Sequence, residues 1–200
     1  MKPSEIGKAY DQIFQKWTDD KFNRENGIEA HKRALAFLKE GNTALDVGCG
    51  CTGRFFELLQ ENGLTPEGID ISERMVEVVR EKYPDLTIYH SDICQWQPPK
   101  QYDFISGWDS IWHVPLAEKE ALIRKLCKAL NPGGVFIFST GGVDEPESIT
   151  DDAMGPEVYY STLGIPRYLE VISEENCICR HLEYDQYPEL HLYLIVQKSG

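Results

Sequence analysis

The segment Leu45-Asp46-Val47-Gly48-Cys49-Gly50-Cys51-Thr52-Gly53 decides the fold of this 200-residue chain. It follows a short apolar run, spaces its glycines as G-x-G-x-x-G, and leads into a stretch with helical periodicity. Glycine lets the backbone turn sharply and approach a ligand that a Cβ atom would keep away. The free N–H groups of the helix that follows offer positive potential to an anion. This order predicts a strand, a ligand-binding loop and a helix.

An acidic residue, Asp70, closes the next apolar run of the chain. In a βαβ unit with a glycine loop, an acid at this place can accept hydrogen bonds from ribose hydroxyls. The loop and the acid together predict a cofactor that contains adenosine. A nicotinamide enzyme and a methyltransferase both meet this pattern, and the simpler alternative is a tight strand-to-helix turn with a capping aspartate.

Short apolar runs alternate with helical stretches through the middle of the chain. The predicted strands are 43–47, 66–70, 86–90, 102–107 and 134–139, and the predicted helices are 52–63, a helix from Ser72 to just before Pro84, and 116–130. This β-α-β-α-β series predicts a parallel sheet with right-handed crossovers. Two further strands, 177–185 and 190–197, predict an antiparallel hairpin at the sheet edge. The expected fold class is therefore α/β, with a mostly parallel seven-stranded sheet and a C-terminal antiparallel hairpin.

The length and the 42% of hydrophobic residues suit one domain over residues 1–200. Its expected parts are an N-terminal helical cap of one or two helices (1–40), a cofactor-binding core (43–140), a substrate-side loop and helix (141–175), and the terminal β-hairpin (176–198). Residues 141–165 are rich in Gly, Pro, Asp and Glu and predict a loop or small lid.

The charge of the chain argues against a nucleic-acid partner. The formal net charge is -13, no run of Lys and Arg forms a basic patch, and an acidic protein repels phosphate backbones. No segment reaches the roughly 18 apolar residues of a membrane helix. Residues 1–10 contain no apolar core of a secretory signal. These features predict a cytoplasmic protein that contacts neither membranes nor nucleic acid.

Six cysteines occur in the chain, and without a secretory signal their thiols are expected to be reduced. Cys177, Cys179 and His181 alternate, so they should share one face of a strand. Zinc sites use wider ligand spacings, and small buried side chains explain this pattern better. No metal is therefore expected.

Taken together, the motifs resemble those of the class I S-adenosylmethionine-dependent methyltransferase family. The matching segments lie between residues 43 and 140, and they are Leu45–Gly50 with Gly53 beyond, Gly68–Ser72 with Met75, Ser91–Ile93, Tyr102–Ser106 and Leu130–Gly134. The resemblance implies a Rossmann-like three-layer α/β/α sandwich. It also implies the cofactor S-adenosyl-L-methionine and the product S-adenosyl-L-homocysteine.

The resemblance implies a role for each matching residue. Asp46 would hold the methionine ammonium, and the backbone of Gly48, Cys49, Gly50 and Gly53 would line the methionine moiety. The adenosine would be held by Asp70 at the ribose hydroxyls, by Ile71, Met75 and Ile93 beside the adenine, and by Asp92 at its amino group. Trp108 would form part of the wall of the cofactor pocket. An acid at Asp46 suits an ammonium and disfavours a diphosphate, which favours the methyltransferase over an NAD-dependent reductase.

The stretch Trp108-Asp109-Ser110-Ile111-Trp112-His113-Val114-Pro115 follows the fourth strand. Ligands of parallel sheets bind beyond the carboxyl ends of the strands, so these residues should face the transferred methyl group. His113 is a candidate general base, Asp109 would orient it or hold a cationic substrate, and Trp112 would stack on the substrate. The alternative is that they brace the loop and fill core, since methyl transfer needs little beyond alignment.

Tyr160 and Arg167 are further candidates for substrate contact. Tyr160 would belong to a lid, and Arg167 would pair with a substrate carboxylate, unless it pairs on the surface with one of the many acids. Tyr10, Trp17 and Phe22 would either cover the pocket or anchor an N-terminal helix, and the second is favoured.

The sequence thus predicts a monomeric or homodimeric enzyme that methylates O, N, S or C of a small molecule. A non-catalytic S-adenosylmethionine-binding protein is the alternative from another class, and an NAD-dependent reductase is the less favoured enzyme.

Overall fold

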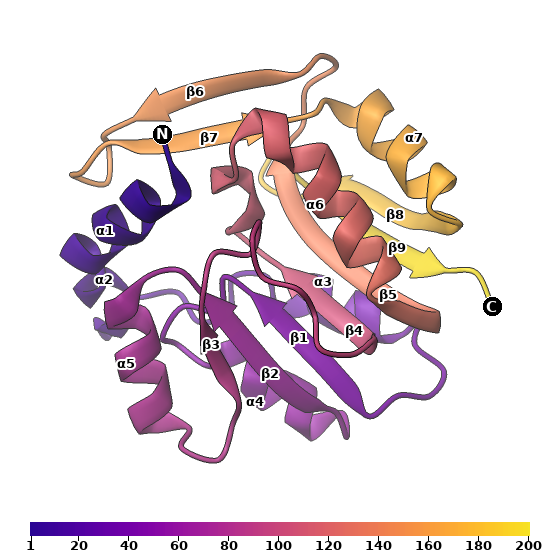
Figure 1. Cartoon of the computed structure of the whole chain (residues 1–200), viewed down its shortest axis with the longest axis horizontal. Coiled ribbons are helices and arrows are strands. Elements are labelled where there is room, and N and C mark those ends of the chain that lie inside the picture. The colour runs from indigo at the N-terminus through magenta and orange to yellow at the C-terminus, as the bar shows by residue number, and fades with distance from the viewer.

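Seven strands form a single twisted sheet in the computed structural model, which describes residues 1–200 (Figure 1). In spatial order they are β3 (Ile88–His90), β2 (Thr65–Asp70), β1 (Thr43–Val47), β4 (Tyr102–Gly107), β5 (Leu130–Gly141), β9 (His191–Lys198) and β8 (Cys177–Tyr184). The first five strands run parallel, and β9 is antiparallel to both β5 and β8. The predicted α/β class and the C-terminal hairpin are confirmed.

The central strands are apolar on both faces because helices cover both. In β5, residues Val135 to Phe138 are completely buried and alternate between two layers of core. A continuous run of large apolar residues is typical of a strand in such a sheet. This sheet therefore forms the middle layer of a three-layer sandwich.

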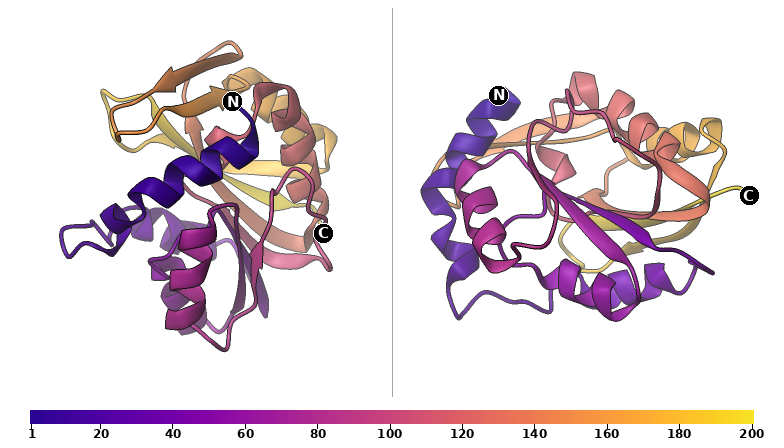
Figure 2. Two further views of the ribbon diagram at one scale, coloured as in Figure 1. Left: turned by 60° about the vertical axis from the view of Figure 1, so that its left-hand side comes forward. Right: turned by 60° about the horizontal axis from the view of Figure 1, so that its bottom comes forward.

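Helices pack on the two faces in two groups (Figure 2). Helices α3 (Ile28–Leu35) and α4 (Arg54–Glu61) cover one face, while α6 (Leu116–Lys128) and α7 (Ile165–Glu174) cover the other. Helix α5 (Glu73–Lys82) packs on β2 and β3. The N-terminal helix α1 (Pro3–Ile13) lies against α5 and β7 (Val158–Thr162), close to the edge where the parallel strands end.

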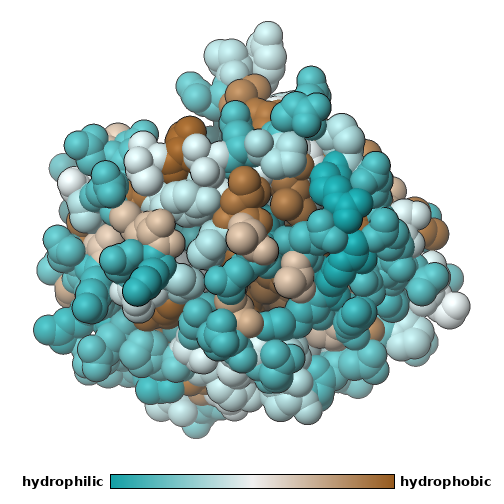
Figure 3. All heavy atoms as spheres, turned by 45° about the horizontal axis from the view of Figure 1, so that its top comes forward, coloured by the Kyte–Doolittle hydropathy of each residue, from teal (hydrophilic) through white to brown (hydrophobic).

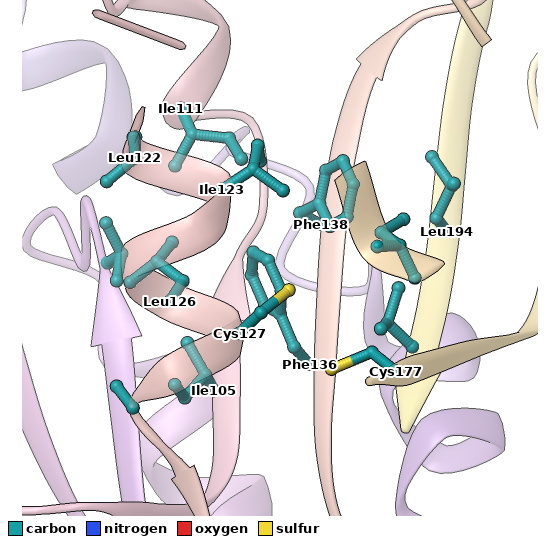
Figure 4. Packing of buried hydrophobic residues seen from close by; sticks show 14 of the residues in the cluster. Ile105, Ile111, Leu122, Ile123, Leu126, Cys127, Phe136, Phe138, Cys177 and Leu194 are labelled. Carbon is teal, nitrogen blue, oxygen red and sulfur yellow. The ribbon is translucent and has the colours of Figure 1, made fainter. Parts of the chain in front are cut away.

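The larger part of the core lies between the sheet and helices α6 and α7. Figure 4 shows Ile123 of α6 directed at Phe138 of β5, and Leu122, Leu126 and Phe136 belong to the same cluster. Cys127 and Cys177 belong to the same cluster, and all six cysteines are free thiols. No group of three or more side chains that could hold a metal ion is formed. Cys177 is buried in this cluster, and Cys179 packs against it.

Three local predictions were wrong. Residues 141–165 were expected to form a loop or a small lid, and the loop is wrong, because β6 (Glu147–Asp151) and β7 form a separate two-stranded antiparallel sheet. Every residue of β6 is exposed, so no alternation of apolar and polar residues marks it. Strand β5 begins at Leu130 and not at Gly134, with Gly133 at a φ of 80°. The N-terminal region contains a third short helix, α2 (Gln15–Thr18).

The molecular surface is mainly hydrophilic on the face drawn in Figure 3, where hydrophobic residues form small patches near the middle and toward the top. None of the helices is long and apolar enough to cross a membrane.

Candidate active site

A cavity of about 410 Å³ opens where the parallel strands end. Its size is that of a pocket for a small organic ligand. Its wall includes nine of the residues predicted to bind the cofactor, namely Gly48, Cys49, Gly50, Asp70, Ile71, Met75, Asp92, Ile93 and Trp108. It also includes Asp109, Trp112, His113 and Tyr160, which were predicted for catalysis or substrate contact. The topology therefore brings together residues from four strand ends that are far apart in the sequence.

Gly48 and Gly50, in the loop after β1, are required to be glycine for different physical reasons. Gly48 has a φ of 71°, and a Cβ there would lie 2.2 Å from the Cβ of Ser110, whose hydroxyl donates to the carbonyl of Val47. Gly50 has a φ of 57°, and a Cβ there would meet no protein atom within 4 Å. Gly48 is needed for close packing inside the protein, whereas Gly50 leaves space free beside the cavity.

Asp70 ties the glycine loop to the end of β2. Its carboxylate accepts hydrogen bonds from the backbone N–H groups of Gly50 and Ser72, each at 2.8 Å. Burial raises the pKa of Asp70, while these N–H donors act in the opposite direction. Asp70 lines the cavity, and its carboxylate oxygens keep lone pairs beyond those used by these two N–H groups. It can therefore still accept hydrogen bonds from ribose hydroxyls.

Two of the predicted cofactor residues do not line the cavity. Asp46 is buried behind the wall beside Ser106, and burial raises its pKa to about 7. Gly53 is the N-cap residue of α4, with a φ of 71°, and a Cβ there would lie 2.1 Å from the ring of Tyr83. Gly53 is therefore explained by packing against Tyr83, which corrects its expected place along the methionine moiety.

His113 lies in the wall with both ring nitrogens engaged. Its Nδ1 is 2.8 Å from the carbonyl of Tyr159, and since a carbonyl only accepts, Nδ1 carries the proton. Its Nε2 then accepts from the hydroxyl of Tyr10 at 2.6 Å and from Nε1 of Trp112 at 3.0 Å. Burial lowers the pKa of His113 to about 4, so the ring is neutral at neutral pH. Its single lone pair is already used, and a substrate could reach it only by displacing Tyr10.

Asp109 does not orient His113, contrary to one of the two roles predicted for it. Its carboxylate instead accepts from Nε2 of His191 at 2.9 Å, from Asn26 at 2.9 Å and from Ser139 at 3.1 Å. These partners hold the pKa of Asp109 below its usual value despite burial. Asp109 also has a φ of 51°, an uncommon conformation for a residue with a side chain. It is thus a fixed negative charge in the cavity wall.

An aromatic wall, defined here as Tyr10, Trp17, Phe22, Trp112 and Tyr160, lines the part of the cavity near His113. The ring centroids of Trp112 and Tyr160 are 5.9 Å apart in a T-shaped pair, and those of Tyr10 and Trp17 are 5.3 Å apart. The N-terminal aromatic residues therefore do line the pocket, which is the less favoured of the two alternatives from the sequence.

Arg167 lies outside the cavity, on the surface of α7. Its guanidinium pairs with Glu120 at 2.8 Å and with Glu170 at 2.7 Å. The expected contact with a substrate carboxylate is corrected to a surface ion pair.

One cavity residue was missed in the sequence. Arg54 directly follows the glycine loop, and its guanidinium lies 4.6 Å from the ring centroid of Phe55 and 5.0 Å from that of Phe22. Its Nε and Nη1 atoms are buried without a hydrogen-bond partner. A basic residue in the first turn after a glycine loop is the signal that could have identified it.

Comparisons with known proteins show the family to which this chain belongs. A family model described as a methyltransferase domain matches residues 20–177. The phosphoethanolamine N-methyltransferase of Plasmodium falciparum is 25% identical over 177 residues, which are 84% of this chain and 65% of that protein. A ubiquinone biosynthesis O-methyltransferase of Idiomarina loihiensis is 30% identical over 152 residues, or 70% of this chain and 61% of that protein. The chain thus spans slightly less than two thirds of these curated relatives.

Solved structures share the fold over the whole chain. The PH0226 protein of Pyrococcus horikoshii superposes with a TM-score of 0.75 at 20% identity, covering 96% of this chain and 98% of that one. The magnesium protoporphyrin IX methyltransferase of Synechocystis, solved with bound S-adenosylmethionine, gives a TM-score of 0.73 at 16% identity and covers 100% and 98%. With the family model matching most of its length, this chain belongs to the methyltransferase domain family.

Proposed function

We propose that this protein transfers a methyl group from S-adenosylmethionine to a small-molecule acceptor. The observation that carries the proposal is that the glycine loop, Asp70 and the aromatic wall meet in one cavity at the ends of the parallel strands. Two further observations support this cofactor. Gly50 leaves space free where a side chain would stand, and Arg54 has buried donors without an acceptor.

The residues of the wall divide the cavity into an adenosine part and an acceptor part. In the proposed complex, Asp70 would accept from the ribose hydroxyls, Ile71, Met75 and Ile93 would pack beside the adenine, and Asp92 would accept from its amino group. The acidic groups Asp46 and Asp109 favour the ammonium of the methionine moiety, one from behind the wall and one within it. The acceptor then lies against the aromatic wall.

Alignment and exclusion of water are the main contributions of this chain to the reaction. S-adenosylmethionine supplies an electrophilic methyl group, which an oriented nucleophile can attack without further activation. His113 is neutral and has its lone pair occupied, so it positions the hydroxyl of Tyr10 in the acceptor part. A base with a pKa near 4 is weak, so His113 is not assigned the removal of a proton from the acceptor.

A small acceptor is supported by the enclosed aromatic wall and by the net charge of -13, which disfavours nucleic acid. The names of the two curated relatives, which refer to phosphoethanolamine and to ubiquinone biosynthesis, are consistent with small acceptors.

Turnover separates this function from mere binding. We expect the purified protein to release S-adenosylhomocysteine from S-adenosylmethionine when a panel of small amines, thiols, phenols and carboxylic acids contains the acceptor. Tyr10→Phe should lower that rate roughly 10-fold because it removes the hydroxyl that His113 positions. Binding of the cofactor without release in any panel member would favour the non-catalytic alternative. Transfer to RNA or protein alone would overturn the small-molecule claim.

The buried Asp46 predicts that cofactor binding depends on pH. Its pKa of about 7 means that part of the free protein carries a protonated Asp46 at neutral pH. A ligand ammonium favours the ionised carboxylate, so binding should release a proton and strengthen as the pH rises through 7. For a group of this pKa, the affinity for S-adenosylhomocysteine should be ~10-fold higher at pH 8 than at pH 6.

Calorimetric titration at both pH values, in two buffers of different ionisation enthalpy, measures the affinity and the released proton together. Asp46→Asn serves as the control and should bind more weakly, with a flat pH profile. The same pH profile in wild type and Asp46→Asn would exclude Asp46 as its origin.

A further inference from the structure

Lys16 and Arg54 are the only lysine or arginine side chains that line the cavity, and they differ in whether the protein supplies a hydrogen-bond acceptor for them. The ammonium of Lys16 donates to the carbonyl of Met154 at 2.7 Å. The guanidinium of Arg54 lies between aromatic rings with Nε and Nη1 buried and unpaired. An unpaired buried donor on a charged group is costly and calls for an explanation. Because Arg54 lines the cavity, an anionic group of a bound ligand would supply an acceptor for its guanidinium.

Acidic groups near Arg54 do not supply the missing acceptor. Asp46 and Asp109 are close enough to influence its pKa, yet neither accepts a hydrogen bond from it. Asp109 is engaged with His191, Asn26 and Ser139. The protein thus holds two carboxylates and one guanidinium around the same part of the cavity, without closing them into an ion pair.

This arrangement is complementary to a zwitterion. A free α-amino acid end carries one ammonium and one carboxylate on the same carbon, and each needs an opposite charge. A guanidinium presents its donors in a planar fork that matches a carboxylate. We infer that Arg54 binds the α-carboxylate of the methionine moiety of the cofactor. The inference rests on the proposed function and names the residue that selects an intact amino acid end.

The place of Arg54 in the chain favours the cofactor over an acidic acceptor. Arg54 is the first residue of α4 and follows the glycine loop directly, so it belongs to the element that holds the cofactor. It stacks on Phe22 at the border of the aromatic wall, and it forms no hydrogen bond with Tyr10, Trp112 or His113, which bond one another.

The test compares ligands that differ only at this group. Wild type and Arg54→Gln are titrated calorimetrically with S-adenosylhomocysteine, with its decarboxylated analogue that keeps the amine, and with 5′-methylthioadenosine, which lacks both groups. Arg54→Gln should weaken S-adenosylhomocysteine about 10- to 100-fold, the range for hydrogen bonds to a charged group, and change the other two ligands less than ~3-fold. Arg54→Lys should fall between, because it keeps the charge and loses the fork.

Arg74→Gln is the matched control. Arg74 does not line the cavity, and its exposed guanidinium pairs with Glu77 at 2.7 Å. Its loss removes one positive charge from α5, whose Met75 lines the cavity, and the affinity for all three ligands should stay within ~3-fold of wild type, since exposed pairs contribute little. Circular dichroism confirms folding of each variant, and Arg54→Lys carries the test if Arg54→Gln does not fold.

Two outcomes would overturn the inference. Equal weakening of all three ligands by Arg54→Gln would assign Arg54 to the shape of the pocket, and no weakening of S-adenosylhomocysteine would place its carboxylate elsewhere. Failure of the wild-type protein to bind S-adenosylhomocysteine is a different result, which contradicts the proposed function itself.

Discussion

Gly50→Val should reduce the affinity for S-adenosylhomocysteine at least ~100-fold while the protein still folds. Gly50 lines the cavity, and a side chain built there meets no other protein atom within 4 Å, so the protein itself does not exclude it. The branched side chain would instead occupy space that the ligand needs. Its φ of 57° adds a conformational cost of about 1–2 kcal/mol for any residue with a Cβ.

Gly63→Val separates the conformational cost from the loss of space. Gly63 has a φ of 79°, also has no atom within 4 Å of a built Cβ, and lies outside the cavity. Thermal unfolding should therefore show similar destabilisation of both variants, and calorimetry should show lost binding only in Gly50→Val. Binding by Gly50→Val as strong as that of wild type would mean that the ligand does not approach this loop.

Asp70→Ala should lower the same affinity on the order of 100-fold, since two hydrogen bonds to a charged acceptor contribute ~1.5–3 kcal/mol each. The variant also removes the acceptor of the Gly50 and Ser72 backbone N–H groups, so the glycine loop loses its tie to β2. Its thermal midpoint should fall as well. Affinity and midpoint are measured on the same preparation by calorimetry and by thermal unfolding.

Asp11→Ala is the control for a loss of stability near the end of β2. Asp11 accepts from the hydroxyl of Ser72 at 2.7 Å and from the backbone of Arg74 at 3.1 Å, and it does not line the cavity. It should destabilise the N-terminus of α5 and leave the affinity within ~3-fold. An equal loss of affinity in both variants would mean that Asp70 only stabilises the glycine loop and does not bind the ligand.

The parts of the fold that sequence could predict are those with a repeating burial pattern. The apolar run Val135 to Phe138 and the glycine loop each determine a local structure, and the family and the fold class predicted from them are confirmed. Strand β6 was missed because all its side chains are exposed, and its only signal is backbone pairing with β7. Such pairing leaves no periodicity in the sequence.

Site residues at the ends of strands could be predicted from the sequence. Contacts between elements that are far apart in the sequence could not. Asp70 and Trp108 follow strands of a parallel sheet, so their common edge followed from topology. The contact of Tyr10 with His113 joins residues 103 positions apart and depends on how α1 docks on the sheet. Asp109 was assigned to His113 by sequence proximity, whereas its partner His191 comes from the C-terminal hairpin.

The most direct test of the central claim is a calorimetric titration of the wild-type protein with S-adenosylmethionine, S-adenosylhomocysteine and NADH. The account predicts one site per chain for each of the two sulfur compounds, with dissociation constants in the micromolar range that corresponds to about −8 kcal/mol, and no heat of binding with NADH. Tight binding of NADH with no response to either sulfur compound would contradict the account and assign the cavity to a nicotinamide cofactor.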